Sequence, residues 1–389
     1  MNGKPPRVVH LIDHMGSGGA QRVILDLLEA RNSGAGDSVV SLRSHCRPEL
    51  RERMHQIGVP YRGLGLARTN PLPVHRIRAA IRESGAEIVH THLEFSNELG
   101  VLGVRSMGRR RPRAIVHVHN DLDRHYTWPH RLAGRAVAPF ADVHVVPSAS
   151  VAASTRAVFG GRVGRFEIIP YGIDSHWFSE GPTRASKSFR AGANAVIGTV
   201  ARLTTQKSLH HLIDAMPTIL AFRPDARLLI FGDGPLRARL SARARSRGIA
   251  RAVTFAGFVP DVASAYASLD VFVLPSRNEG LPICLLEAMA MGIPIVGARV
   301  TGISDLVTDE QTGLTVPYGD PVAIARAVVR LLRDDVMRDR TRSNARKLVE
   351  TRFTRAAVAQ QMEGLYRALC AGDAAHSRNP DFEIGAATR

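Results

Sequence analysis

Two glutamates separated by seven residues, Glu279 and Glu287, lie in the segment of the chain that is richest in possible chemistry. Pro282 suits the first position of a helix, so the amides of Gly280 and Leu281 are expected near a helix N-terminus that can bind phosphate. Glu287 then falls inside an otherwise apolar helix and needs a polar partner, because a bare buried carboxylate is costly. Two sugar hydroxyls would satisfy it. The alternative is that Glu287 pairs with an arginine and Glu279 only caps the helix.

Two cations precede this segment. Arg202 and Lys207 lie in the loop after the apolar run 195–200, in a chain where lysine is rare. A loop at the carboxyl end of a parallel strand faces the ligand side of its sheet. Arginine binds a diphosphate as a bidentate fork and lysine binds it as a point charge, so the pair predicts a diphosphate site. The alternative is that both are solvated loop charges.

A glycine-rich loop opens the first half of the chain. Gly16, Gly18 and Gly19 stand between an expected strand and an amphipathic helix, where the backbone can approach an anion closely. Position 21 is Gln instead of the third glycine of a dinucleotide loop, and no acidic strand end follows about 20 residues later. Both features argue against a nicotinamide cofactor. A tight turn without a ligand is the alternative.

Four histidines end two neighbouring strands, His90 and His92 on one and His117 and His119 on the next. Alternation along a strand places each pair on one face of the sheet. Neither pair has a carboxylate in helical register with it, so no metal is expected here. We interpret His90, His92 and His117 as core residues.

These residues need a scaffold, and the chain alternates strands with helices twice over. Strands are expected at 8–12, 38–42, 87–91, 114–119 and 143–146, and again at 195–200, 226–231, 252–255, 270–274 and 294–297. Helices are expected at 208–221, 236–247, 322–333, 337–350 and 356–369. This pattern predicts an α/β fold of two Rossmann-like, doubly wound domains that face a central cleft.

Domain boundaries are expected where the composition changes. An N-terminal domain spans 1–178, a polar linker spans 179–194 and a C-terminal domain spans 195–353. A helix at 354–372 is expected to cross back to the N-terminal domain, and 373–389 to form a flexible tail.

Composition is that of an ordinary globular protein except for the charge. Of 389 residues, 44% are hydrophobic, no run approaches the ~20 apolar residues of a membrane span, and the N-terminus lacks the apolar core of a signal peptide. Three distant cysteines exclude a disulfide framework. We therefore expect a cytoplasmic protein that is at most peripheral on the cytosolic face of a membrane. The net charge of +17 fits anionic lipid, nucleic acid or phosphorylated substrates, or simply an arginine-rich proteome.

Several motifs resemble those of the retaining glycosyltransferases of family 4, which have the GT-B fold. The segment from Glu279 to Glu287 resembles their Glu-x7-Glu motif. Further similar segments, which together extend the resemblance over nearly the whole chain, are Gly18-Gly19 with Arg22, 169–174, 198–207 and 231–235. The chain departs from the family pattern at Tyr171, where Asn is usual, at Ser208, where Gly is usual, and at 301–305, so Asp305 is left without a role.

The resemblance implies a role for each matching residue. The catalytic residues would be His119, Arg202, Lys207 and Glu279, with the two cations on the donor diphosphate and the other two on the donor sugar. The donor-binding residues would be Gly18, Gly19, Arg202, Lys207, Gly232, Gly234, Gly280, Leu281 and Glu287, the last on the ribose hydroxyls. No metal and no cofactor are implied, because the nucleotide sugar is a substrate. Asp121 and Asp123 form an Asp-x-Asp pattern that binds metal in another glycosyltransferase fold, and we interpret them as a loop or helix-start pair.

The implied activity is metal-independent transfer of a hexose from a nucleoside-diphosphate sugar to a hydroxyl, with retention. The acceptor is expected to be a lipid-linked oligosaccharide or glycolipid of surface polysaccharide synthesis. The basic segments 109–113 and 124–131 would then dock the first domain on an anionic membrane, the alternative being a solvated surface. Other functions that fit are a nucleotide-sugar epimerase, a phosphorylase and a catalytically silent binding subunit. A nucleic-acid partner is not expected, because no recognition-helix or RNP-like motif occurs.

Overall fold

The computed structural model describes residues 4–16, 18–31, 36–66, 73–122, 127–160, 163–174, 188–190, 192–259 and 261–372. This part of the chain forms two compact units. Unit 1 contains the residues up to Gly172 and those from Arg355 onward, and unit 2 contains Ile173–Thr354. Most of the expected linker and the whole of the expected tail lie outside the described residues.

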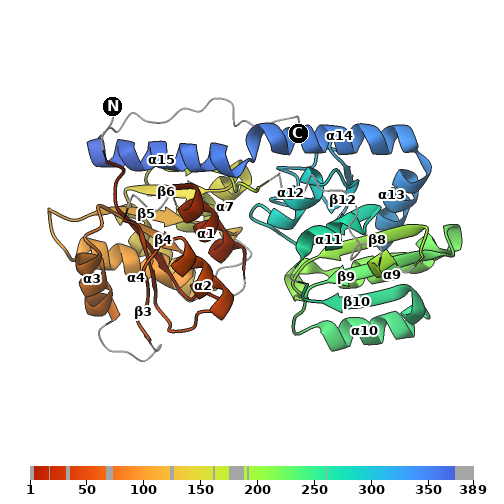
Figure 1. The fold of residues 1–389 in the computed structure, drawn as a ribbon, viewed down its shortest axis with the longest axis horizontal. Helices are drawn as coiled ribbons and strands as arrows, with labels where there is room; N and C mark the ends of the chain where they lie inside the picture. The colour runs from red at the N-terminus through yellow and green to blue at the C-terminus, as the bar shows by residue number, and fades with distance from the viewer. Residues whose placement is uncertain are drawn as a thin grey trace. The chain divides into compact units, whose positions relative to one another are not determined.

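Unit 1 is built on a seven-stranded parallel sheet in the order β3-β2-β1-β4-β5-β6-β7. The strands are β1 (Val8–Ile12), β2 (Ser38–Ser41), β3 (Tyr61–Gly63), β4 (Ile88–His92), β5 (Arg113–His117), β6 (Val143–Val146) and β7 (Phe166–Ile168). The helices are α1 (Gly19–Arg31), α2 (Pro48–Gln56), α3 (Pro73–Ser84), α4 (Glu94–Arg105), α6 (Trp128–Val137) and α7 (Ala149–Phe159), with a 3-10 turn η2 (Ala138–Phe140). All residues of β1 and β4 are buried, as in a parallel sheet covered on both faces (Figure 1).

Unit 2 contains a six-stranded parallel sheet in the order β10-β9-β8-β11-β12-β13. The strands are β8 (Ala195–Val200), β9 (Ala226–Phe231), β10 (Val253–Gly257), β11 (Val271–Leu274), β12 (Ile295–Ala298) and β13 (Leu314–Val316). The helices are α9 (Leu209–Phe222), α10 (Arg237–Ser246), α11 (Val262–Ala267), α12 (Ile283–Ala290), α13 (Pro321–Arg333) and α14 (Asp335–Arg352), with 3-10 turns η4 (Thr205–Lys207) and η5 (Ala250–Ala252).

The expected class of fold, two doubly wound α/β sheets, is confirmed within each unit. The ten expected strands are all present, with ends shifted by at most two residues. Strands β3, β7 and β13 were not predicted from the sequence. Each has three residues and lies at a sheet edge, so it is too short to show a period of its own and forms only by pairing with its neighbour.

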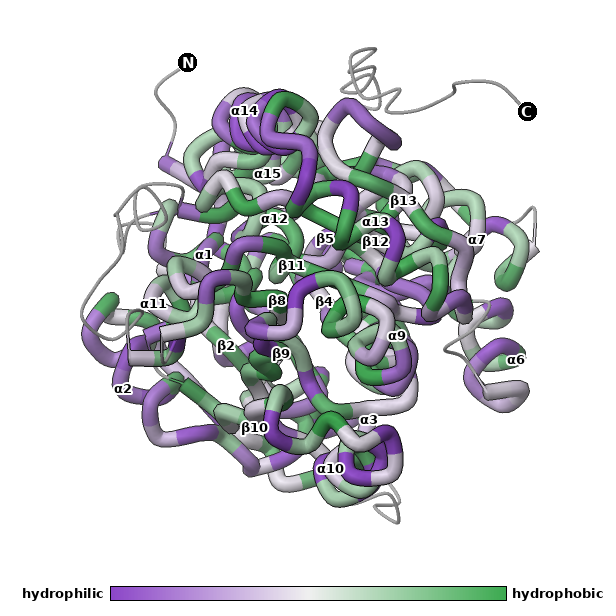
Figure 2. The backbone as a smooth tube through the Cα atoms, turned by 90° about the vertical axis from the view of Figure 1, so that its right-hand side faces the viewer, coloured by the Kyte–Doolittle hydropathy of each residue, from purple (hydrophilic) through white to green (hydrophobic). Residues whose placement is uncertain are grey.

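The last two helices belong to different units. α14 buries only Met337, Thr341, Ala345 and Val349, a stripe at four-residue spacing, and its tube is largely hydrophilic in Figure 2. α15 (Arg355–Ala371) belongs to unit 1, where it packs on α1 (Figure 1). Two ion pairs join α1 and α15, one between Arg31 and Glu363 and one between Arg355 and Glu29. No helix in the described part of the chain is long and apolar enough to cross a membrane.

Candidate active site

Lys207 and Glu279 form an ion pair at one end of the unit 2 sheet. The ammonium of Lys207 donates to Oε1 of Glu279 at 2.7 Å, and the two side chains are only 12% and 7% exposed. Burial acts to lower the pKa of Lys207, but the adjacent Glu279 carboxylate outweighs it, so the lysine pKa lies above its ordinary value. Lys207 is therefore held as a permanent cation.

Backbone contacts hold the two partners of this pair together. The amide of Arg277 donates to the carbonyl of Gln206 at 2.8 Å. In return, the Gln206 side chain donates to the carbonyl of Asn278 at 2.9 Å. The loop after β8 and the segment before α12 are thus fixed to each other on both sides of the ion pair.

Glycines at 232 and 234 position the loop that carries Arg202. A Cβ atom on Gly232, which has φ +116°, would lie 2.1 Å from the carbonyl oxygen of Ala201. A Cβ atom on Gly234 would lie 2.7 Å from the carbonyl oxygen of Leu203. The turn can therefore pack backbone to backbone on both neighbours of Arg202 only because it lacks side chains there. Arg202 itself is exposed.

Two residues, one beside Lys207 and one beside His92, have left-handed backbone conformations. Ser208, directly after Lys207, has φ 49° and ψ 34°. It occupies the position where the resemblance expects glycine, and it keeps the conformation that glycine prefers. Leu93, directly after His92, has φ 72° and ψ 167°, a region that is strained for any residue with a side chain.

The N-terminus of α12 presents unpaired backbone amides. The helix begins at Ile283, and Pro282 is its N-cap. The sequence predicted Pro282 at the first helical position, so the helix begins one residue later than predicted. Within the described part of the chain, the amides of Gly280, Leu281 and Ile283 have no hydrogen-bond partner. Groups of this kind bind an anion readily, because the helix dipole adds to their own polarity.

A second loop, which contains Thr301 and Gly302, packs against the segment before α12. The amide of Glu279 donates to the carbonyl of Thr301 at 3.1 Å. Gly302 packs so closely that a Cβ atom there would lie 2.5 Å from the carbonyl oxygen of Gly280. Asp305 accepts a hydrogen bond from the Gly302 amide at 3.2 Å, so this carboxylate helps to shape the loop.

Glu287 has a partner that the sequence did not indicate. It is 3% exposed, and the hydroxyl of Tyr266 on α11 donates to its Oε2 at 2.6 Å. The sequence suggested two sugar hydroxyls or an arginine as partners of Glu287, and it did not suggest this tyrosine. No sequence signal could have found it, because Tyr266 comes from a short helix 21 residues earlier.

The glycine loop of unit 1 is closed by a side chain. α1 begins at Gly19, and a Cβ atom on Gly18 would lie 2.5 Å from Oε1 of Gln21. The Gln21 amide group also donates to the carbonyl of His14 at 3.0 Å. The residue that stands where a dinucleotide loop has its third glycine therefore braces the loop.

His119 follows β5 in unit 1, and both of its ring nitrogens are engaged. Nε2 lies 3.0 Å from Nδ1 of His92, and Nδ1 lies 2.8 Å from the hydroxyl of Tyr171. Burial lowers the pKa of His119 to about 3, so its imidazole is neutral. A contact between this ring and a ligand would require one of these two partners to be exchanged.

The remaining predicted features have local structural partners. Asp121 accepts a hydrogen bond from Ser154 on α7, which fits the interpretation as a loop residue, while Asp123 lies outside the described residues. In the basic run 109–113, Arg111 and Arg113 pair with Asp142 at 2.7 and 3.3 Å. Arg109 and Arg110 are exposed.

The structure thus brings the predicted residues together in two groups. Unit 2 gathers Arg202, Lys207, Gly232, Gly234, Glu279, Gly280, Leu281 and Glu287 around two loops and the start of α12. Unit 1 carries Gly18, Gly19 and His119. The first group combines a fixed cation, unpaired amides and a buried carboxylate, an arrangement that can bind a phosphate next to a polyhydroxyl group.

Comparison with protein families gives two matches that follow each other along the chain. The family model described as Glycosyltransferase Family 4 matches residues 17–177. The model described as Glycosyl transferases group 1 matches residues 194–334.

Individual relatives match across both units. The D-inositol 3-phosphate glycosyltransferase of Corynebacterium urealyticum is 30% identical over 306 residues, which cover 73% of this chain and 72% of the relative. The GDP-mannose-dependent alpha-(1-6)-phosphatidylinositol monomannoside mannosyltransferase of Mycolicibacterium smegmatis is 32% identical over 278 residues, which cover 68% and 72%.

Among solved structures, Anabaena HepE in complex with UDP-glucose is similar with a TM-score of 0.82. The match covers 93% of this chain and 100% of that chain, at 20% sequence identity. At this identity the likeness establishes the fold, and the expected GT-B architecture is confirmed.

Proposed function

Because the chain belongs to glycosyltransferase family 4, we propose that it transfers a hexose from a nucleoside-diphosphate sugar to a hydroxyl group with retention of configuration. The observation that carries this proposal is the Lys207–Glu279 pair beside the unpaired amides of Gly280 and Leu281. A fixed ammonium and free amides are what a diphosphate needs. The names of two similar proteins support a nucleotide-sugar donor, one being GDP-mannose-dependent and the other holding UDP-glucose.

The charged residues and the free amides of the unit 2 group each have a role in this proposal. Lys207 and Arg202 hold the donor diphosphate, the first as a point charge and the second as a fork. The amides at the start of α12 bind the same phosphate oxygens. Glu279 accepts hydrogen bonds from hydroxyls of the donor sugar. Glu287, oriented by Tyr266, accepts hydrogen bonds from the ribose hydroxyls.

The chemistry follows from where the charge develops. As the bond to the anomeric carbon breaks, negative charge grows on the leaving diphosphate, and Lys207 and Arg202 stabilise it electrostatically. The acceptor hydroxyl enters on the face that the diphosphate leaves, and a diphosphate oxygen takes its proton. Glu279 and Glu287 therefore do not act as the paired carboxylates of a glycosidase. We propose that the two cations supply the positive charge that a metal would otherwise provide.

The test is a titration of the purified protein with UDP- and GDP-sugars in the presence of a chelator, followed by an assay of donor hydrolysis. Lys207→Ala and Glu287→Ala should each weaken binding of the preferred donor at least about tenfold, which corresponds to about 1.4 kcal/mol. Lys347→Ala, at an exposed lysine on α14 of the same unit, is the matched control and should bind normally. Failure of every nucleotide sugar to bind would refute the proposal.

On the acceptor side, we propose a lipid-linked or glycolipid hydroxyl presented at an anionic membrane surface. Trp128 and Leu132, one turn apart on α6, are 77% and 64% exposed, and Phe140 on η2 is 41% exposed. α6, η2 and α4 pack on one another, and Arg105 at the end of α4 stacks over the Phe140 ring at 5.4 Å. Exposed aromatic groups next to arginines suit the interface of an anionic bilayer.

This second part is tested with vesicles. The protein should sediment with vesicles that contain anionic lipid at physiological salt, and Trp128→Glu/Leu132→Glu should weaken this binding at least about tenfold. Val322→Glu/Val336→Glu, at two exposed valines of unit 2, is the matched control and should sediment normally. Equal sedimentation of both double variants would remove the membrane from the proposal without affecting the donor site.

A further inference from the structure

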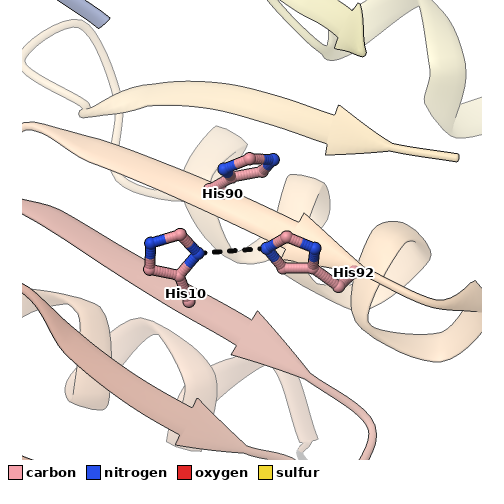
Figure 3. A group of neighbouring side chains, drawn as sticks. All are labelled: His10, His90 and His92. Atoms are coloured by element: carbon pink, nitrogen blue, oxygen red, sulfur yellow. Dashed lines mark hydrogen bonds between the residues drawn. The ribbon is translucent and has the colours of Figure 1, made fainter. Parts of the chain in front are cut away.

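Five histidines gather on one face of the unit 1 sheet. His10 projects from β1, and His90 and His92 project to the same side from the adjacent strand β4 (Figure 3). His117 ends β5, and His119 follows it. The strand register pairs His10 with His90 and His92 with His117. All five are buried, and only four of them were singled out in the sequence.

Three of these rings and one tyrosine form a continuous chain. Nδ1 of His10 lies 3.1 Å from Nε2 of His92, and Nδ1 of His92 lies 3.0 Å from Nε2 of His119. The chain ends at Tyr171, whose hydroxyl lies 2.8 Å from Nδ1 of His119. Both ring-to-ring steps have centroid separations of 5.3 Å and interplanar angles of 24°. The centroids are farther apart than the nitrogens by about one ring width, so the rings meet edge to edge.

Edge-to-edge nitrogens at this distance favour hydrogen bonds over a bound metal. A zinc–nitrogen bond is about 2.0–2.1 Å long and protein zinc sites are tetrahedral, so two imidazole nitrogens bound to one zinc ion lie about 3.3–3.4 Å apart. The facing nitrogens of His10, His92 and His119 are closer than that. Burial also lowers the pKa values of His10, His92 and His119, so each ring is neutral and carries one N–H.

The direction of these hydrogen bonds follows from counting donors and acceptors. The hydroxyl of Tyr171 donates to the carbonyl of His119 at 3.4 Å, which leaves its oxygen to accept from Nδ1–H of His119. Nε2 of His119 then accepts from His92, and Nε2 of His92 accepts from His10. Nε2 of His10, which has no partner in the described part of the chain, is left as a lone pair. The opposite direction would leave a buried N–H there instead, which proteins tolerate less well.

We propose that His10, His92, His119 and Tyr171 form one hydrogen-bonded relay of fixed direction, and that it positions His119 as an N–H donor through Nδ1 toward a sugar hydroxyl. The second clause rests on the proposed function. A sugar hydroxyl that replaced the Tyr171 hydroxyl on Nδ1–H would leave every other bond of the relay unchanged, because both are hydroxyl oxygens. His10 and His92 are then positioning residues, and Tyr171 marks a departure of this chain from the family pattern.

The relay is tested by ¹⁵N NMR of the histidine side chains, which distinguishes protonated from unprotonated ring nitrogens. His10, His92 and His119 of the unliganded protein should all carry the proton on Nδ1. In Tyr171→Phe, either direction leaves one N–H and one lone pair unpaired, so all three rings should show mixed tautomers, including His10 at the far end. The relay would be overturned by a change confined to His119 in Tyr171→Phe. It would also be overturned if His10, His92 or His119 showed a Nε2–H signal in the unliganded protein.

Tyr366→Phe is the matched control. Tyr366 is also buried, and its hydroxyl lies 2.7 Å from Nδ1 of His90, which in turn contacts His117 at 3.2 Å. This second chain shares no member with the relay, so the tautomers of His10, His92 and His119 should not change. If Tyr171→Phe does not fold, the spectra of the unsubstituted protein still decide the direction of the relay.

Two further measurements separate this proposal from its alternatives. Saturation with the preferred nucleotide sugar should shift the signals of His119 and His10 together. Donor binding that leaves both unchanged would refute the positioning role while the transferase proposal stands. If no donor binds, the positioning role and the proposed function both fail, and the unliganded spectra alone judge the relay. A stoichiometric transition metal in the purified protein, with ring nitrogens deprotonated, would replace the relay with a metal site.

Discussion

Lys207 keeps its charge because the carboxylate of Glu279 lies 2.7 Å from its ammonium group. Without that carboxylate, burial would favour the neutral amine. A neutral amine could not hold a diphosphate, so Glu279 supports the cation besides its proposed contact with the sugar. The two residues should therefore behave as one unit in stability and as separate groups in donor binding.

Lys207→Met should lower the free energy of unfolding by about 3 kcal/mol, because it leaves a buried carboxylate without its partner. Lys207→Met/Glu279→Gln should recover most of that loss, since no buried charge is left unpaired. Donor binding should be lost in both variants. Urea unfolding and donor titration measure the two effects, and recovery of donor affinity along with stability would mean that Lys207 is only structural.

Ser208 offers a cleaner residue-scale test, because its φ of 49° is unfavourable for any residue with a Cβ atom. Ser208→Gly and Ser208→Ala both remove the hydroxyl, which contacts the carbonyl of Thr205. Only the glycine relieves the backbone, so its free energy of unfolding should exceed that of the alanine variant by about 1 kcal/mol. Equal stability in urea unfolding would show that the loop relaxes to another conformation.

At the scale of elements, the loops around α12 and β8 position the candidate site by packing backbone against backbone. Gly232 and Gly234 contact the loop of Arg202, and Gly302 contacts the segment of Glu279. Such contacts leave no room for a side chain, so the geometry of the site depends on glycines that touch no ligand in the proposal themselves. A methyl group added at one of these glycines should therefore weaken donor binding by shifting the loop that it contacts.

Gly234→Ala should weaken donor binding about tenfold, because its methyl group would displace the carbonyl of Leu203 and with it Arg202. Gly248→Ala is the control. It lies after α10 in open space with φ +69°, so it should cost about 1–2 kcal/mol of stability without touching the loop. Donor titration and urea unfolding of both variants check the prediction, which fails if the two weaken binding equally.

At the scale of the whole molecule, buried neutral histidines link stability to pH. Burial lowers the pKa of His10 and His144 to about 4 and that of His119 to about 3. When the pH falls below the ordinary histidine pKa near 6.5, these histidines are protonated in the unfolded chain but stay neutral in the folded protein. The free energy of unfolding should therefore fall steadily as the pH drops from about 6.5 toward 4.

His144 isolates this effect, because neither of its ring nitrogens has a partner in the described residues and it lies outside the relay. His144→Leu should make the acid-side loss of stability less steep by up to about 1.4 kcal/mol per pH unit. Thermal or urea unfolding at several values between pH 7 and pH 5 measures the slope. An unchanged slope would mean that His144 takes up protons as readily in the folded protein as in the unfolded chain.

The alternation of strands and helices and most of the candidate site follow from local sequence patterns. Parallel strands buried on both faces read as short apolar runs, and a loop must follow each, so β8 and β11 marked where Lys207 and Glu279 would lie. Both signals depend only on neighbouring residues in the sequence, so they can be recognised without the structure. The same local signals failed for the three-residue edge strands.

The contacts between residues that are distant in the sequence follow only from the folded arrangement of the chain. The chain His10–His92–His119 depends on which strands are neighbours and in what register, and His10 is 82 residues from His92. Tyr266 reaches Glu287 from a separate helix, and Ser208 has a left-handed backbone conformation that its residue type does not predict. Periodicity describes one segment at a time, whereas a hydrogen bond between distant segments exists only once the chain has folded and brought them together.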